Sequence, residues 1–240
     1  MDSFLIKYLQ SGKAWVLVGS GPSIEMGYPS WEGLASLAVK LVTAEQTGYN
    51  LTNLNRAMKN KDFPQVFQEA ENIIGGPLLL NHLRDNNKAN KPGRIYDLIT
   101  KWPVPVYMTT NYDDELQSNL AKWGEPYTIY SNSSDHFGFL IPSLHGAIVK
   151  LHGDLRSESG LILTKEHYEE IEKGDAWQYW RTRMTSIFQM NPVVVIGHSL
   201  SDNNIRHVLE AAKEGATVEQ PICWIAPDIK YDECKELLEN

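Results

Sequence analysis

Cysteine is scarce in this sequence. The 240 residues include two, Cys223 and Cys234, and these do not form a Cys-x-x-Cys pair. A disulfide framework is therefore excluded, and a cysteine-rich structural zinc site has no ligands to use. Cys223 lies in an apolar run and is most simply explained as core packing.

Long apolar runs and basic clusters are also missing. No apolar run approaches the ~20 residues that cross a bilayer, and residues 1–4 carry neither the basic region nor the hydrophobic core of a signal peptide. Lys and Arg are scattered, and the formal net charge is −8. These features predict a cytoplasmic protein without membrane or nucleic-acid contacts. They do not exclude a small anionic ligand held by backbone amides.

The hydrophobic pattern predicts strands that alternate with helices. Continuous apolar runs are typical of parallel strands that are covered on both faces. Such runs occupy residues 14–18, 104–108, 147–151, 192–196 and 222–226, with a shorter candidate at 127–130. The predicted fold class is α/β, a Rossmann-like doubly wound parallel sheet.

One domain is expected to occupy residues 1–240. Residues 45–100 are interpreted as a small, mainly helical insertion, with helices near 63–74, 78–83 and 95–99. A last helix is predicted at 231–239, and it has no C-cap signal. The chain is therefore either complete or the N-terminal part of a longer protein.

A polar cluster, Thr-Asn-Tyr-Asp, follows the apolar run at 104–108 and occupies residues 110–113. In isolation this segment favours simple helix capping, because Asp114 has Gln117 three residues later, as in a capping box. It also lies where ligands bind in open α/β sheets, at the carboxyl end of a strand.

Three other predicted strands end in unusual turns. These are Gly-Ser-Gly at 19–21, His-Gly-Asp at 152–154 and Gly-His-Ser at 197–199. Each has an ordinary structural explanation, such as a tight turn or a packed histidine. Because the carboxyl ends of parallel strands share one edge, their coincidence predicts a single ligand site.

These motifs, in this order, resemble those of sirtuin-like NAD-consuming domains. The resemblance rests on residues 19–23, 27–31, 110–113, 151–154 and 197–202, and it covers most of the chain. It is greatest for the bacterial branch found in antiphage defence proteins, which includes the Thoeris effectors. The motif order is specific for the superfamily and less so for one subfamily.

The resemblance implies two catalytic residues. Asn111 would contact the nicotinamide ribose of NAD+ and position the attacking water, and His152 would act as general base. A histidine has a suitable pKa without large perturbation. Asp113 would hold the loop and the ribose environment.

The resemblance also implies a set of NAD-binding residues. Gly19, Ser20 and Gly21 would bind the diphosphate through backbone amides, and Gly197 with Ser199 would line the adenosine side. Asp202 is either an adenosine-side contact or a helix N-cap. No metal is expected.

Departures from the family pattern bear on the substrate. Deacetylating sirtuins carry a four-cysteine zinc module and an Ile where this chain has Tyr112, and Pro22 removes one backbone donor from the first loop.

The expected activity is NAD+ glycohydrolysis that depletes NAD+ in antiphage defence by abortive infection. The alternatives are cyclisation to a cyclic ADP-ribose, an NAD-dependent protein deacylase and a non-catalytic NAD or ADP-ribose sensor. A homo-oligomer is expected, switched by a sensor domain, a partner protein or a phage-derived trigger.

Overall fold

The computed structural model describes residues 3–45, 48–124, 127–132, 146–156, 160–199, 202–215 and 222–225. The helix predicted at 231–239, Cys234, and residues 200 and 201 of the last motif lie outside the described residues. None of the described helices is long and apolar enough to cross a bilayer.

Six parallel strands form one sheet, which confirms the predicted fold class. In chain order they are β1 (Trp15–Val18), β2 (Val106–Thr109), β3 (Thr128–Ser131), β4 (Ala147–Lys150), β5 (Val193–Ile196) and β6 (Ile222–Ile225). Their order across the sheet is β3-β4-β2-β1-β5-β6. The inner four are buried throughout, whereas the edge strands β3 and β6 are partly exposed. Continuous apolar runs therefore mark the centre of the sheet.

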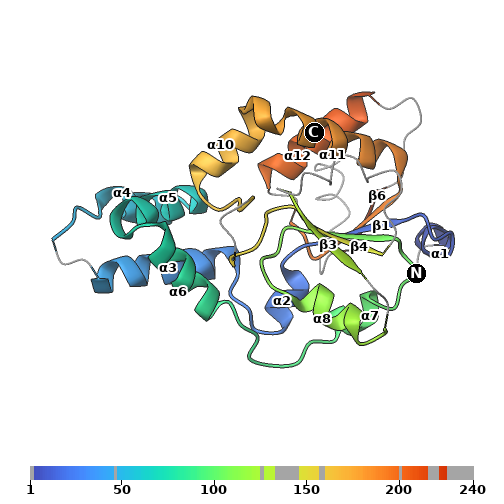
Figure 1. Cartoon of the computed structure of the whole chain (residues 1–240), viewed down its shortest axis with the longest axis horizontal. Helices are drawn as coiled ribbons and strands as arrows, with labels where there is room; N and C mark the ends of the chain where they lie inside the picture. The colour runs from blue at the N-terminus through green and yellow to red at the C-terminus, as the bar shows by residue number, and fades with distance from the viewer. Residues whose placement is uncertain are drawn as a thin grey trace.

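Helices cover both faces of the sheet (Figure 1). On one face lie α1 (Ser3–Gln10), α2 (Gly21–Glu25), α7 (Ile95–Ile99) and α8 (Glu115–Ala121). The apolar side chains of α1, α7 and α8 share a core with this face of the strands. On the other lie α10 (Lys165–Lys173), the short 3₁₀ helix η2 (Asp175–Trp177), α11 (Gln178–Met190) and α12 (Asn203–Gly215). The alternating faces of each strand supply the two cores.

A separate helical unit lies beside the sheet (Figure 1). It contains α3 (Trp31–Glu45), α4 (Thr52–Lys59), α5 (Phe63–Ile74) and α6 (Gly76–Asn86), which enclose their own core. The sequence pattern predicts one helical insertion at residues 45–100, whereas the unit also includes α3 and does not include α7. The apolar stripe of α3 packs on α5 and α6, whereas α7 packs against α2 and α8 beneath the sheet.

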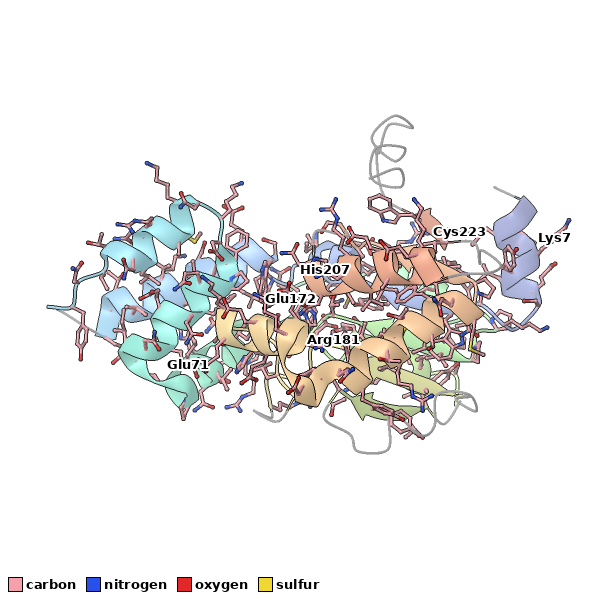
Figure 2. The ribbon with its side chains drawn as sticks, turned by 90° about the horizontal axis from the view of Figure 1, so that it is seen from above. Lys7, Glu71, Glu172, Arg181, His207 and Cys223 are labelled. Carbon is pink, nitrogen blue, oxygen red and sulfur yellow. The ribbon has the colours of Figure 1, made fainter. Side chains whose placement is uncertain are left out.

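Helix α10 joins the two parts of the molecule. It contacts α5 of the helical unit as well as α11 and α12 on the sheet. Figure 2 shows it between them, with Glu172 of α10 beside His207 of α12. Side chains on α10 can therefore face both the helical unit and the loops at the strand ends.

The strand order creates a switch point at β1. From β1 the chain moves to β2, β3 and β4 on one side, and then crosses to β5 and β6 on the other. The connections that follow β1 and β5 therefore run in opposite directions, which opens a crevice at the carboxyl ends of these two neighbouring strands. All the predicted motifs follow strands that end at this edge.

Candidate active site

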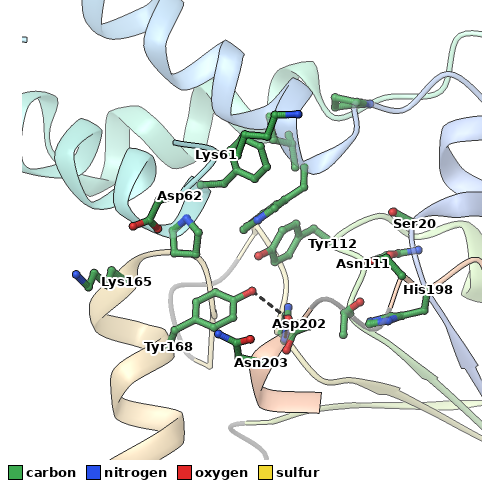
Figure 3. A pocket seen from close by; sticks show the side chains of 18 of the residues that line it. Ser20, Lys61, Asp62, Asn111, Tyr112, Lys165, Tyr168, His198, Asp202 and Asn203 are labelled. Carbon is green, nitrogen blue, oxygen red and sulfur yellow. Dashed lines mark hydrogen bonds and ion pairs between the residues drawn. The ribbon is translucent and has the colours of Figure 1, made fainter. Parts of the chain in front are cut away.

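A cavity of about 600 Å³ lies at the carboxyl ends of the inner strands. Its walls come from the strand-end loops, from the α4–α5 turn of the helical unit and from α10 (Figure 3). Of the residues predicted for the site, it is lined by Ser20, Asn111, Asp113, His152, Ser199 and Asp202. The strand-end motifs thus converge on one site, at the switch point where ligands bind in this fold class.

Asn111 is buried and its amide orientation is determined by its neighbours. Its Nδ2 donates to the Gly19 carbonyl at 2.7 Å, to Ser23 Oγ at 3.2 Å and to Tyr96 Oη at 3.2 Å. A flipped amide would place its oxygen against the Gly19 carbonyl oxygen, so this orientation is favoured. The nitrogen is engaged within the protein, which leaves Oδ1 as the side-chain atom to meet a ligand.

Asp113 supports this network. Ser23 Oγ donates to Asp113 Oδ2 at 2.8 Å and lies 2.7 Å from Tyr96 Oη. Burial raises the pKa of Asp113, while its bonds from Ser23 and from the Glu115 amide act in the opposite direction. Asp113 therefore holds the β1 and β2 loops together through Ser23.

The predicted capping box at Asp114 is wrong. The side chain of Asp114 makes no cap bond with α8, and Asp113 Oδ1 accepts from the Glu115 amide at 3.0 Å. Asp114 turns instead toward Lys150 Nζ, at 3.3 Å, and toward Arg156. A nearby buried cation attracts the carboxylate more strongly than a helix terminus does.

Lys150 joins the loop after β2 to the loop after β4. Its side chain is 3% exposed, and Nζ contacts Asp154 at 2.6 Å and the Tyr112 carbonyl at 3.3 Å. Arg156 adds a second cation beside Asp154, which lowers the pKa of that carboxyl even though burial opposes the effect. The loops after β2 and β4 are thus held by one charge network.

The glycines pack the loops and do not offer free amides. Gly19 N donates to the Ile196 carbonyl and Gly21 N to the Gly197 carbonyl, each at 2.9 Å. The two amides that were predicted to bind a diphosphate are thus engaged within the protein in this structure. A Cβ on Gly19 would lie 2.5 Å from His198 Cα, so glycine is needed for close contact between the loops.

His152 is buried in the cavity wall, after β4. Its Nε2 lies 3.3 Å from Asp202 Oδ2, but not in hydrogen-bond geometry, and no other group in the described part of the chain forms a hydrogen bond with this nitrogen. Burial lowers the pKa of His152, and the negative charge of Asp202 partly offsets the effect. A neutral imidazole at this place can act as a base.

Asp202 caps helix α12. Its Oδ1 accepts from the Ile205 amide at 3.1 Å, which confirms the N-cap alternative. Its Oδ2 accepts from Tyr168 Oη at 3.2 Å, as drawn in Figure 3. The same oxygen faces His152 Nε2 at 3.3 Å, so the carboxylate links α12, α10 and the loop after β4.

His198 and Tyr168 were not predicted as site residues. His198 lies within the last motif, between the predicted Gly197 and Ser199, and that position was a usable signal. Burial lowers its pKa to about 4; the nearby Asp202 raises this pKa and the nearby His152 lowers it. Tyr168 lies on α10, far from any motif, and no local pattern marks it.

Aromatic side chains form the wall toward the helical unit. Trp31 lies with its ring 4.8 Å from Phe67 and 6.1 Å from Tyr112, and Tyr112 donates to the Ile162 carbonyl. Tyr112, which departs from the family pattern, thus closes the space between the sheet and the helical unit. Lys61, at the mouth, has a φ of 58°, which is costly for a lysine.

Residues 105–240 match the SIR2-like domain family, and this span is more than half of the chain. The chain belongs to the SIR2-like domain family. The matched span contains the Asn111, His152 and His198 loops, whereas the Gly19 loop precedes it. Within the described part of this SIR2-like domain, no group of three or more His, Cys, Asp or Glu side chains is placed to hold a metal ion.

Curated relatives of this SIR2-like domain are named NAD(+) hydrolase ThsA. The protein from Cytobacillus dafuensis is 25% identical over 207 residues, which are 85% of this chain and 39% of the relative. That from Enterococcus faecium is 21% identical over 202 residues, 84% of this chain and 40% of the relative. That from Acinetobacter baumannii (strain 532279) is 24% identical over 207 residues, which are 85% of this chain and 40% of the relative. The chain therefore spans about two fifths of the length of these relatives.

Proposed function

We propose that this SIR2-like domain is an NAD+ glycohydrolase. Water attacks the anomeric carbon of the nicotinamide ribose, the carbon–nitrogen bond breaks, and nicotinamide leaves with the bonding electron pair. His152 accepts a proton from the water, and ADP-ribose is the second product. The observation that carries the proposal is the meeting of Asn111 and His152 in one cavity at the switch point of the sheet.

The polar groups of the cavity suit this reaction. Positive charge develops on the sugar as nicotinamide departs, so fixed negative dipoles near the anomeric carbon lower the barrier. Asn111 presents a carbonyl oxygen because its nitrogen is held by Gly19, Ser23 and Tyr96. His152 is kept neutral by burial and is ready to take a proton.

The cavity also suits the size of the substrate. Its volume of about 600 Å³ lies in the range of small-molecule and cofactor sites. Ser20 and Ser199 supply polar groups to the wall, and we assign them to the diphosphate and the adenosine side. Gly19, Gly21 and Gly197 act through close packing, which places Ser20 and the Gly19 carbonyl.

The biological role follows from the same proposal. The relatives carry the name NAD(+) hydrolase ThsA, and the motifs resemble those of antiphage defence proteins. We propose that the domain depletes NAD+ in the cytoplasm during abortive infection, as a homo-oligomer that is switched by a sensor domain, a partner or a phage-derived trigger. This chain spans about two fifths of the length of those relatives. Experiments that look for the trigger therefore use the whole protein.

Product analysis tests the activity. The protein is incubated with NAD+, with and without an acetyl-lysine peptide, and nicotinamide, ADP-ribose, cyclic ADP-ribose and O-acetyl-ADP-ribose are separated by chromatography. We expect nicotinamide and ADP-ribose in equal amounts without peptide. Nicotinamide release that requires the peptide would identify a deacylase and contradict the proposal. Binding of NAD+ without turnover, in the whole protein with its trigger, would identify a sensor instead.

A further inference from the structure

The carboxylate of Asp202 does more than cap a helix. An N-cap needs one oxygen, and Oδ1 fulfils that role by accepting from the Ile205 amide at 3.1 Å. Oδ2 accepts from Tyr168 Oη at 3.2 Å and lies 3.3 Å from His152 Nε2. The second oxygen is therefore held toward the imidazole by a tyrosine from a different element, α10.

His152 gives the independent observation. Its side chain is 5% exposed, and its Nε2 has no hydrogen-bond partner among the residues that the structure describes. A buried polar nitrogen without a partner is costly and uncommon. The nearest acceptor to Nε2 among the described groups is Asp202, and the ring of Tyr168 packs edge-on against the imidazole with its centroid at 5.7 Å.

We propose that Asp202 is a positioning residue for His152 and that Tyr168 fixes Asp202 in place. The inference rests on the NAD+ hydrolysis proposed above. The negative charge of Asp202, 3.3 Å from Nε2, favours the tautomer with its hydrogen on Nε2. This tautomer leaves the lone pair on Nδ1 to accept the proton of the attacking water. The imidazolium that results is stabilised by the carboxylate, and its proton passes to solvent when ADP-ribose leaves.

The charged and titratable groups around His152 determine the sign of the effect. Asp202 faces it from α12, Tyr168 from α10 and His198 from the loop after β5, and Tyr112 faces Asp202 from the loop after β2. Burial lowers the pKa of His152, and Asp202 raises it. Removing the charge of Asp202 therefore lowers this pKa further and weakens the base.

The decisive variant is Asp202→Asn, because Asn is as good an N-cap as Asp and has nearly the same size. We expect kcat for nicotinamide release to fall on the order of 10- to 100-fold, part of the usual contribution of a general base. The KM for NAD+ should change by less than about twofold, because Asp202 does not touch the substrate in this proposal. The acid limb of the pH–rate profile should move to lower pH.

Two further variants serve as comparisons. Tyr168→Phe removes the hydroxyl that holds Oδ2 and should lower kcat by a smaller factor. Asp97→Asn, at an exposed ion pair with Lys101 on the other face of the sheet, should leave kcat, KM and the pH profile unchanged. Thermal unfolding of Asp202→Asn should match that of the wild type, since the cap is preserved.

Three results would overturn the proposal. An unchanged kcat and pH profile in Asp202→Asn would leave Asp202 as a helix cap only. A change confined to KM would make it a substrate contact. The third result comes from NMR.

Nitrogen-15 NMR of the His152 imidazole gives a readout that needs no turnover. We expect the Nε2–H tautomer in the wild type and a mixture of tautomers in Asp202→Ser, because serine caps the helix but is too short to reach the ring. An Nδ1–H tautomer in the wild type would contradict the proposal even if the protein cleaves no NAD+, so the two failures are distinguishable.

Discussion

His152 and His198 line the same cavity, and both are buried and face Asp202. A motif marks a loop, but burial and neighbours determine which of its side chains titrate.

The stability of the fold should depend on His198 in acid. Burial lowers its pKa from 6.5 to about 4, so the unfolded chain binds a proton that the folded protein refuses. The contribution of His198 to the free energy of unfolding is therefore present above pH 6.5 and is lost as the pH drops toward 4. The loss amounts to about 3 kcal/mol, at about 1.4 kcal/mol per pH unit. His198→Gln should remove this part of the pH dependence, as measured by urea unfolding between pH 7 and pH 4.

His207→Asn is the control, since His207 is about half exposed. Its pH dependence should match that of the wild type. An undiminished loss of stability in His198→Gln would show that His198 is not held neutral by the fold.

At the scale of elements, the loops after β1 and β5 depend on glycine contact. Gly197 has a φ of 59°, and a Cβ there would lie 2.6 Å from Pro22 Cδ. Gly197→Ala should lose about 1–2 kcal/mol for the left-handed backbone and a further ~1–3 kcal/mol for the overpacked contact. Affinity for NAD+, measured by calorimetry in a His152→Ala background, should fall because Ser20 and the Gly19 carbonyl shift.

Gly124→Ala provides the matched comparison. Gly124 has a φ of 74°, and an added Cβ would meet nothing within 4 Å. It should show the backbone cost alone and bind NAD+ normally. Equal losses in both variants would mean that the contact between the loops does not matter.

The charge network between the loops after β2 and β4 should also contribute measurably to the free energy of unfolding. Lys150→Met leaves Asp114 and Asp154 without their buried cation, and we expect a loss on the order of 3 kcal/mol in the free energy of unfolding. Lys101→Met breaks an exposed pair with Asp97 and should cost under about 1 kcal/mol. Similar losses in the two variants, measured by denaturant unfolding, would contradict the structural role given to Lys150.

At the scale of the whole molecule, the sheet was predictable and the grouping of helices was not. The buried strands are recognisable in the sequence as apolar runs, because parallel strands are covered on both faces. The stripe on α3 predicts a buried face but not the partner, and it packs in the helical unit and not on the sheet. Pairing between distant elements is a tertiary property that periodicity does not encode.

The residues of the candidate site were likewise predictable only in part. Asn111 and His152 follow strands directly, so the topology brings them together once the sheet is parallel. Asp114 was misassigned because the competing partner, Lys150, lies 36 positions further along the chain. Tyr168 reaches the site only because α10 joins the helical unit to the sheet.

The central claim is that Asn111 and His152 together cleave NAD+ at the switch point of the sheet. Its most direct test is single-turnover release of nicotinamide by the wild type, Asn111→Ala and His152→Ala, each shown to be folded and each saturated with NAD+. We predict release in the wild type and losses of at least about 100-fold in both variants, as expected for a lost dipole or base in a preorganised site. Release at the wild-type rate by either variant, at saturating NAD+, would contradict the account.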